Sequence, residues 1–152
     1  MGPLTLPAQG PVYLDTNCFI YSVERIEPFR TLLEPIWHEA RDGRFEIISS
    51  EIIVAETLVK PFRAGDEVVE TLLRSLFNAQ EVTLIPATRE IWEDAARLRA
   101  ETGLKLPDAL HAATAIAANC ALFVTNDADF RRVPRLLTAV LADLLSAEGH
   151  GQ

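Results

Sequence analysis

The 152-residue sequence has few of the features that mark common catalytic or binding sites. It has only two cysteines, Cys18 and Cys120, which lie far apart in apolar segments and do not have the spacing of a zinc site. We expect both to be free, buried thiols, with a disulfide as the alternative. A glycine-rich phosphate-binding loop and a Gly-x-Ser-x-Gly nucleophile motif are also missing, which argues against P-loop nucleotide enzymes and α/β-hydrolases.

Long apolar runs are missing as well. The longest apolar tract, 109–124, contains His, Thr and Asn, and it is shorter than the ~20 residues that a membrane span needs. The first ten residues, MGPLTLPAQG, have neither a basic start nor an apolar core, so they do not form a signal peptide. We expect them to be a lead-in before the domain. A cytoplasmic protein without a membrane segment is therefore predicted.

Positive charge is scarce. The chain has 14 Lys and Arg against 22 Asp and Glu, which gives a net charge of −8, and its basic residues form no run. This balance argues mildly against a generic nucleic-acid binder, because such proteins are usually basic. Clustered carboxylates that bind a divalent cation, or a basic partner protein, would explain the excess of negative charge.

The chain does have 49% apolar residues, arranged in short runs that alternate with helical patterns. We find no repeat or linker, so we expect one domain over 11–145, with a lead-in at 1–10 and a tail at 146–152. Strands are expected at 12–15, 45–49, 82–86 and 121–126. Helices are expected at 17–24, 28–42, 50–59, 67–78, 89–102 and 107–119. The segment 136–145 fits a strand, a helix, or a strand followed by a helix.

This alternation predicts a parallel α/β sheet that is covered by helices on both faces. In such a sheet the functional site lies beyond the carboxyl ends of the strands. Asp15 directly follows the first expected strand, and Asp127 follows the fourth. We therefore expect both carboxylates at the site.

Each of these acids also has a simpler explanation. Asp15 could cap the helix after it, although Thr16 or Asn17 could do so equally well. Asp127 and Asp129 in TNDADF could cap a turn or bind a cation. Asp127 is nearer to the strand end, whereas Asp129 is expected to support the site or to be solvated.

Two further acids lie on expected helices. Glu56 has mostly apolar neighbours three and four residues away, where a carboxylate is costly unless it pairs with Lys60 or binds a metal, and the sequence favours neither. Asp108 follows Pro107, which is ordinary for a first helical turn, but the alanine-rich helix after it can pack closely against its neighbours. His111, three residues after Asp108, is more typical of a packed or supporting residue than of a base.

The acids are more informative together than singly. Carboxylate oxygens are the ligands that Mg²⁺ and Mn²⁺ prefer. A metal held by such a cluster activates water and clamps a phosphodiester for in-line attack. The candidate site therefore consists of Asp15, Glu56, Asp108 and Asp127.

Four segments resemble the motifs of PIN-domain ribonucleases: YLDTNCFIY, the acid within SEIIVAE, KLPDALHAATAI and LFVTNDADF. The likeness is greatest to the VapC-type toxins of bacterial and archaeal toxin–antitoxin pairs, and it covers about residues 12–141. It implies a three-layer α/β/α, PIN-like (5′-nuclease-like) fold with a central, mostly parallel sheet. It also implies a homodimeric endoribonuclease that depends on Mg²⁺ or Mn²⁺ and is held inactive by a VapB-like antitoxin.

The resemblance also implies roles for individual residues. The family's four signature acids, which bind metal and carry catalysis, fall on Asp15, Glu56, Asp108 and Asp127. Asn17 and Thr125 match polar residues that accompany the first and last acids. Independently of the resemblance, three arginines follow the last acid, and they would hold RNA phosphates or belong to the solvated surface: Arg131, Arg132 and Arg135.

Two other functions compete with this hypothesis. A non-catalytic, PIN-like interaction module is one, although such a module has no need to crowd four carboxylates together. An aspartate-nucleophile phosphatase or transferase is the other. That class usually has a second acid two residues after the first, where this chain has Asn17.

Overall fold

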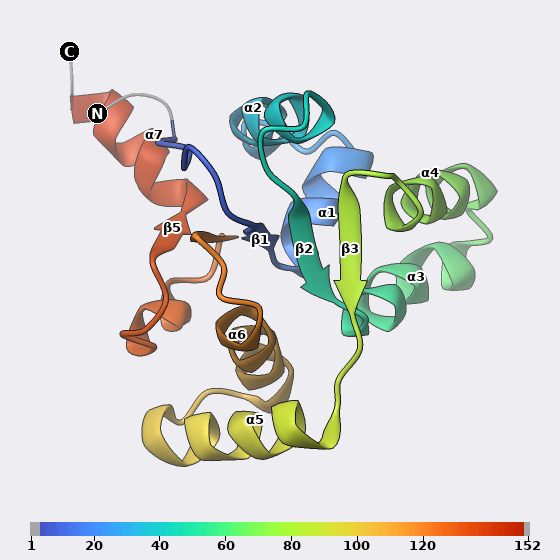
Figure 1. Ribbon diagram of the computed structural model, residues 1–152. Helices are drawn as coiled ribbons and strands as arrows, with labels where there is room; N and C mark the ends of the chain where they lie inside the picture. The colour runs from blue at the N-terminus through green and yellow to red at the C-terminus, as the bar shows by residue number, and fades with distance from the viewer. Residues whose placement is uncertain (1–3, 151–152) are drawn as a thin grey trace.

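A computed structural model describes residues 4–150 of the chain, and the side chains of residues 4–145. Within that range the chain forms five strands, seven α-helices and one short 3₁₀ helix, η1 (Figure 1). The elements of the first half are β1 (Val12–Leu14), α1 (Thr16–Val23), α2 (Phe29–Arg41), β2 (Ile47–Ser50), α3 (Ile52–Ala64) and α4 (Glu67–Phe77). Those of the second half are β3 (Val82–Ile85), α5 (Arg89–Thr102), α6 (Leu106–Ala117), β4 (Leu122–Thr125), η1 (Ala128–Arg132), β5 (Thr138–Val140) and α7 (Leu141–His150).

The five strands form one sheet in the order β3-β2-β1-β4-β5, and every neighbouring pair is parallel. The expected parallel sheet is confirmed. The chain builds outward from β1 to β3, then returns to the other side of β1 for β4 and β5. This reversal lies between β1 and β4, and in open parallel sheets it marks the crevice where ligands bind.

Helices cover both faces of the sheet, which confirms the predicted three-layer α/β/α arrangement. Val12 and Leu14 pack in a core with residues of α1 and α2, whereas Tyr13 packs in a second core with residues of α5 and α6. Alternate residues of a strand point to opposite faces, so β1 contributes to both cores. Figure 1 shows α1 and α2 on one side of the sheet and α5 and α6 on the other.

Local signals set the ends of α5 at the residues expected from the sequence. The Thr88 hydroxyl oxygen accepts a hydrogen bond from the Ile91 backbone N–H at 3.3 Å, which caps the first turn. Gly103 ends the helix in the left-handed conformation, with φ of 73°.

The expected end of α3 before Pro61 is wrong. The helix continues through Pro61 to Ala64 and ends at Gly65, whose φ of 64° is left-handed. Pro61 has no N–H to donate to the Thr57 carbonyl, which costs the helix one hydrogen bond. Ile53, Thr57 and Pro61 are all buried, however, and their spacing of four residues places them on one face of the helix. Packing of that face sustains the helix beyond its proline.

The other boundaries up to β4 differ from the expected ones by at most two residues, since the exact ends of strands depend on pairing. Expected strand 45–49 is Ile47–Ser50, and α2 begins at Phe29 and continues through Pro35. The ambiguous segment 136–145 forms a strand followed by a helix. That helix, α7, continues into the predicted tail as far as residue 150. Residues 151–152 of the tail lie outside the described residues. In the lead-in, Leu4 and Leu6 pack against the first core, while residues 1–3 lie outside the described range.

The cysteines are free, as expected. Cys18 is buried, while Cys120 is only half-buried.

Among residues 4–150, none of the helices is both long and apolar enough to cross a membrane.

The aromatic stack in the second core yields a stability prediction. Phe123 is fully buried between Tyr13 and Phe130, with ring centroids 4.9 and 4.7 Å away. We expect Phe123→Ala to lower the free energy of unfolding by about 3–5 kcal/mol, because it removes this packing and leaves a cavity. Phe62 on α3 is 57% exposed, so Phe62→Ala is the control and changes stability by only about 0.5 kcal/mol. Equal losses in urea titrations of the two variants would contradict this packing.

Candidate active site

The four predicted acids line one pocket of about 240 Å³. The pocket lies at the carboxyl ends of β1 and β4, where the chain reverses across the sheet. Its lining consists of Asp15, Thr16, Asn17, Ile20, Glu56, Asp108, His111, Asp127 and Phe130. Carboxylates from four separate parts of the chain are therefore brought together by the fold.

Asp15 is 6% exposed and has two roles. It caps α1 by accepting a hydrogen bond from the Cys18 backbone N–H at Oδ1, 3.4 Å away, and it also lines the pocket. Its Oδ2 accepts a hydrogen bond from the Thr125 hydroxyl at the end of β4. The Thr125 oxygen in turn accepts from the Asp127 backbone N–H at 3.0 Å. Thr125 thus links the two strand-end acids.

The pKa of Asp15 is raised above its ordinary value. Burial is the largest cause, because it disfavours the charged carboxylate, and it outweighs the opposing hydrogen bond from Thr125. Asp15 therefore carries its charge at a cost to the fold.

Glu56 on α3 pairs with a histidine and a threonine, so the alternative of a pair with Lys60 is wrong. Its Oε1 accepts a hydrogen bond from the Thr16 hydroxyl at 2.6 Å and lies 3.0 Å from His111 Nε2. Lys60 Nζ instead contacts Glu24 at 3.3 Å. Burial acts to raise the pKa of Glu56, but the hydrogen bonds of His111 and Thr16 outweigh it, and the net pKa is lowered. Glu56 is therefore an ionised acceptor.

Asp108 is half-buried in the first turn of α6. Its pKa is raised, first by burial and then by the negative charge of Asp127, with smaller contributions from Asp15 and Glu56. All three other pocket acids thus act on Asp108 through their charges. Mutual repulsion of this kind favours a bound cation.

Asp127 caps η1 by accepting a hydrogen bond from the Asp129 backbone N–H at 2.9 Å. Asp129 itself is exposed, does not line the pocket, and lies 3.3 Å from Arg132. Asn17 is exposed and lines the pocket rim. Arg131 forms an ion pair with Asp143 of α7.

Sequence reasoning missed the contacts that Thr16 and Tyr13 make here. Thr16 was considered only as a possible cap, yet its hydroxyl contacts Glu56. The Tyr13 hydroxyl lies 2.7 Å from His111 Nδ1 in the buried core. One signal was available, because a buried tyrosine hydroxyl needs a hydrogen-bond partner and His111 lies on an otherwise apolar helix.

The four carboxylates of the pocket supply only oxygen ligands, which are the ligands that a hard divalent cation prefers. The side chains are not gathered into a finished coordination shell. In the described part of the chain, no group of three or more His, Cys, Asp or Glu side chains lies close enough together to hold a metal ion. Coordination would therefore require rotation of these side chains.

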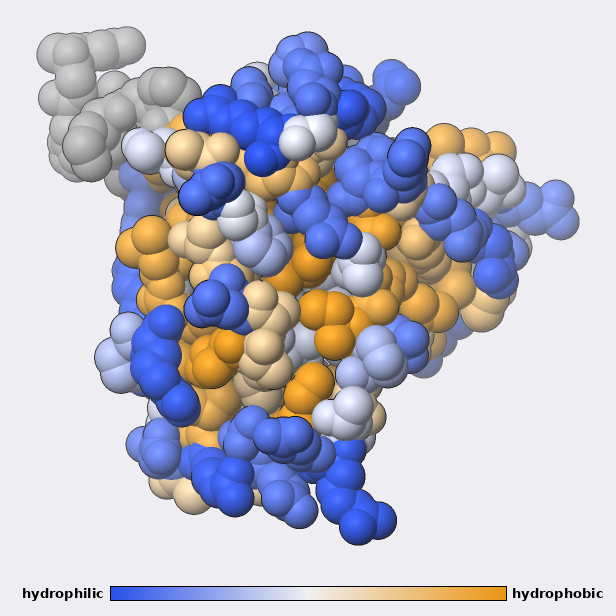
Figure 2. Space-filling view, in the orientation of Figure 1, coloured by the Kyte–Doolittle hydropathy of each residue, from blue (hydrophilic) through white to orange (hydrophobic). Residues whose placement is uncertain are grey.

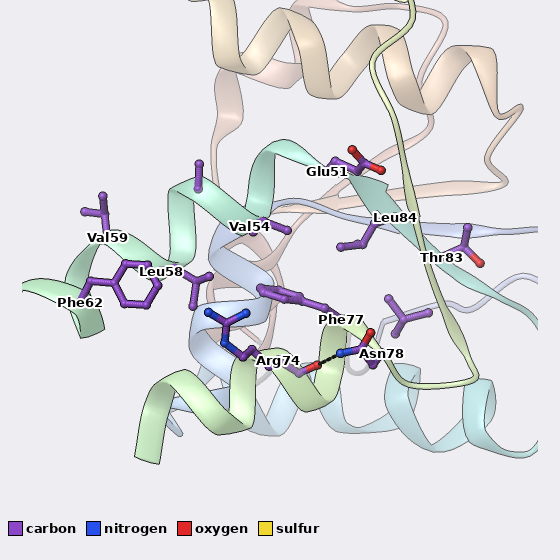
Figure 3. Close-up of a pocket in the computed structure, with 12 residues that line it drawn as sticks. Glu51, Val54, Leu58, Val59, Phe62, Arg74, Phe77, Asn78, Thr83 and Leu84 are labelled. Atoms are coloured by element: carbon purple, nitrogen blue, oxygen red, sulfur yellow. Dashed lines mark hydrogen bonds between the residues drawn. The ribbon is translucent and has the colours of Figure 1, made fainter. Parts of the chain in front are cut away.

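A larger hollow of about 1000 Å³ lies elsewhere, between α3, α4 and β3 (Figure 3). Its lining is mainly apolar and includes Val54, Leu58, Phe62 and Phe77, but none of the four acids. Figure 2 shows apolar side chains gathered over the face where β3, α3 and α4 lie. The larger hollow therefore lacks the carboxylates that could bind a cation.

Comparison with protein families matches residues 12–136 to the PIN domain. The chain therefore belongs to the PIN domain family, as its four motifs implied.

Among solved structures, the chain is similar to VapBC2 from Rickettsia felis bound to a promoter DNA fragment. The identity is 23% over 86% of this chain and 98% of that chain, with a TM-score of 0.68. It is also similar to VapC20 from Mycobacterium tuberculosis, a toxin that cleaves the sarcin–ricin loop (14% identity, 79% and 92% coverage, TM-score 0.64). FitAcB from Neisseria gonorrhoeae is a third similar structure (18%, 86% and 98%, TM-score 0.58). Comparison with curated proteins found no match. At these identities the likeness establishes the fold.

The raised pKa of Asp108 predicts a pH effect on stability. Because the folded-state pKa lies above the unfolded value, the folded state holds the proton more tightly. The contribution of Asp108 to the free energy of unfolding is therefore fully present below the ordinary Asp pKa. It is lost as the pH rises through the raised, folded-state pKa. Asp108→Asn removes this loss, so at neutral pH we expect the variant to be more stable than the wild type.

The measurement is urea unfolding across a pH series, with chelator present. Asp94→Asn is the control, because Asp94 is an exposed acid paired with Arg97 on α5 and should give no gain. A less stable Asp108→Asn at neutral pH would contradict the repulsion described here.

Proposed function

We propose that this chain is a metal-dependent endoribonuclease and the toxin of a VapBC-type toxin–antitoxin pair. The observation that carries the proposal is that four carboxylates from separate elements line one pocket at the sheet reversal of a PIN-domain chain. The similarity to VapBC2 and to a toxin that cleaves the sarcin–ricin loop supports it.

Mg²⁺ or Mn²⁺ is the proposed cofactor. Asp15 and Asp108 would be its principal ligands, with Glu56 and Asp127 completing the site directly or through water. When bound, such an ion makes water a better nucleophile at neutral pH and stabilises negative charge on the phosphate.

The protein's own groups have separable tasks in this hydrolysis. Asp15 is held in place by Thr125 and by the first turn of α1, so its position does not depend on substrate. Glu56 is ionised and anchored by Thr16, and it is suited to orient the attacking water and accept its proton. Water attacks phosphorus and the bond to the 3′ oxygen breaks, which leaves a 5′-phosphate and a 3′-hydroxyl. The RNA 2′-hydroxyl is not needed as a nucleophile.

A VapB-like antitoxin is the proposed protein partner, and RNA in the cytoplasm is the proposed substrate. The net charge of −8 and the crowded acids favour a partner that places a basic side chain in the pocket.

Homodimerisation is also proposed. Exposed apolar side chains, among them Phe62 on α3 and Trp92 on α5, offer surface for such contacts. Light scattering on the purified chain tests the dimer.

The competing functions are less consistent with the site. A binding module would not need the neighbouring negative charges that, after burial, raise the pKa of Asp108. A nucleophilic aspartate needs a free, exposed oxygen, yet Asp15 is 6% exposed and both of its oxygens accept hydrogen bonds.

The nuclease proposal predicts that cleavage of defined RNAs requires Mg²⁺ or Mn²⁺ and stops with chelator. Asp15→Asn should lower kcat/KM by roughly 100-fold or more, because it removes a charged ligand while preserving shape. Product ends are identified by labelling, with a 5′-phosphate and a 3′-hydroxyl expected. Asp94→Asn is the matched control and should cleave normally, because Asp94 does not line the pocket and pairs with Arg97. Cleavage that survives both chelation and Asp15→Asn would overturn the proposal.

The toxin proposal has a separate test. Expression of the chain should arrest growth, and co-expression of a small neighbouring reading frame with a DNA-binding N-terminus should restore it. In vitro, that partner should suppress RNA cleavage. Normal growth despite active, metal-dependent cleavage would refute the toxin role and leave the nuclease assignment intact.

A further inference from the structure

We propose that Tyr13 and His111 are positioning residues that hold the Glu56 carboxylate at the pocket wall through a buried chain of hydrogen bonds. The inference rests on the proposed function, because Glu56 acts there on the attacking water. It assigns a role to two core residues that do not touch substrate.

The inner end of this hydrogen-bond chain, at Tyr13, is rigid. Tyr13 lies on the central strand, is 0% exposed, and stacks on Phe123 at a centroid distance of 4.9 Å. Its hydroxyl lies 2.7 Å from His111 Nδ1, and the two rings meet edge to face. The tyrosine ring therefore cannot move without disturbing the core, and it sets where the imidazole lies.

The outer end reaches the pocket. His111 Nε2 lies 3.0 Å from Glu56 Oε1 and also 3.0 Å from Thr16 Oγ1. The side chain of His111 is 3% exposed, whereas that of Glu56 is 30% exposed. The chain of contacts thus runs from β1 through α6 to α3 and passes from closed core to solvent-facing carboxylate.

The hydrogen-bond partners determine where the protons lie. The Glu56 carboxylate is an acceptor, and the Thr16 hydroxyl already donates to it. Nε2 must therefore carry a hydrogen, which it shares between Glu56 and Thr16. A neutral imidazole then has its lone pair on Nδ1, so the Tyr13 hydroxyl donates to it.

This assignment satisfies every group involved. Among the side chains that the structure describes, no buried nitrogen or oxygen atom is left without a hydrogen-bond partner.

The role of Tyr13 is then to hold the imidazole ring in place from its inner side. Without its hydroxyl, Nδ1 loses its hydrogen-bond donor and the ring is held only at Nε2. The imidazole can then shift, so the Glu56 carboxylate loses a donor at a fixed position. Residues that orient a functional group in this way typically affect activity by 10–100-fold.

Two substitutions of His111 separate positioning from packing. In His111→Gln the amide nitrogen lies near the place of Nε2 and still donates to Glu56, whereas in His111→Asn the amide reaches only the place of Nδ1. We expect His111→Asn to lower kcat by about 10–100-fold with the KM for RNA unchanged, and His111→Gln to keep most of the activity. His38→Asn is the control, because His38 is exposed on α2 beside Asp42, and it should behave as wild type.

Nitrogen-15 NMR of the imidazole ring tests the tautomer without any assay of activity. At mildly alkaline pH the wild type should carry its ring proton on Nε2, and the Nδ1 resonance should shift in Tyr13→Phe, which keeps the aromatic packing but removes the hydrogen bond to Nδ1. A proton on Nδ1 in the wild type would overturn the proposal. So would equal kcat values for folded His111→Asn and His111→Gln. If the wild type cleaves no RNA, the proposed function fails. The NMR result still decides whether the hydrogen bonds from Tyr13 through His111 to Glu56 are arranged as described.

Discussion

The contact between the Thr125 hydroxyl and the Asp15 carboxylate is the interaction on which the site depends. It joins the ends of β1 and β4, the two strands between which the chain reverses direction across the sheet. It partly offsets the cost of a carboxylate that is almost fully buried. It also places Asp127, whose backbone N–H donates to the same threonine oxygen. One hydroxyl thus aligns the two acids that parallel strands alone would only bring near each other.

The carboxylates of the pocket act on one another through their charges. Asp108 feels the charge of all three other pocket acids, and both it and Asp15 have raised pKa values. Glu56 is the exception, because Thr16 and His111 satisfy its charge. The site therefore combines repelling carboxylates, which favour a cation or a basic side chain, with one carboxylate that is already stabilised. This division suits different roles within one reaction, with some acids binding charge and another acting on water.

Much of the fold could be predicted because its signals are local. Capping by Thr88 and Gly103 sets the ends of α5, and the buried strand that precedes Asp15 is visible as a short apolar run. The predictions failed where tertiary packing overrides local preference. Pro61 would end an isolated helix, but its buried face keeps α3 intact. The partner of Glu56 was equally unpredictable, since Lys60 is its neighbour on the helix whereas His111 is 55 residues away.

By itself, the sequence determined that the protein is a parallel α/β domain with acids at the ends of two strands, because periodicity and residue order carry that information. Its four motifs also identified the family to which the chain belongs. Tertiary structure alone decided which side chains meet. The Tyr13 hydroxyl contacts His111, and His111 contacts Glu56, through distances that no spacing in the chain specifies. The physical reason is that Tyr13 and His111 are buried, so their hydrogen-bond partners must come from whichever elements pack against them.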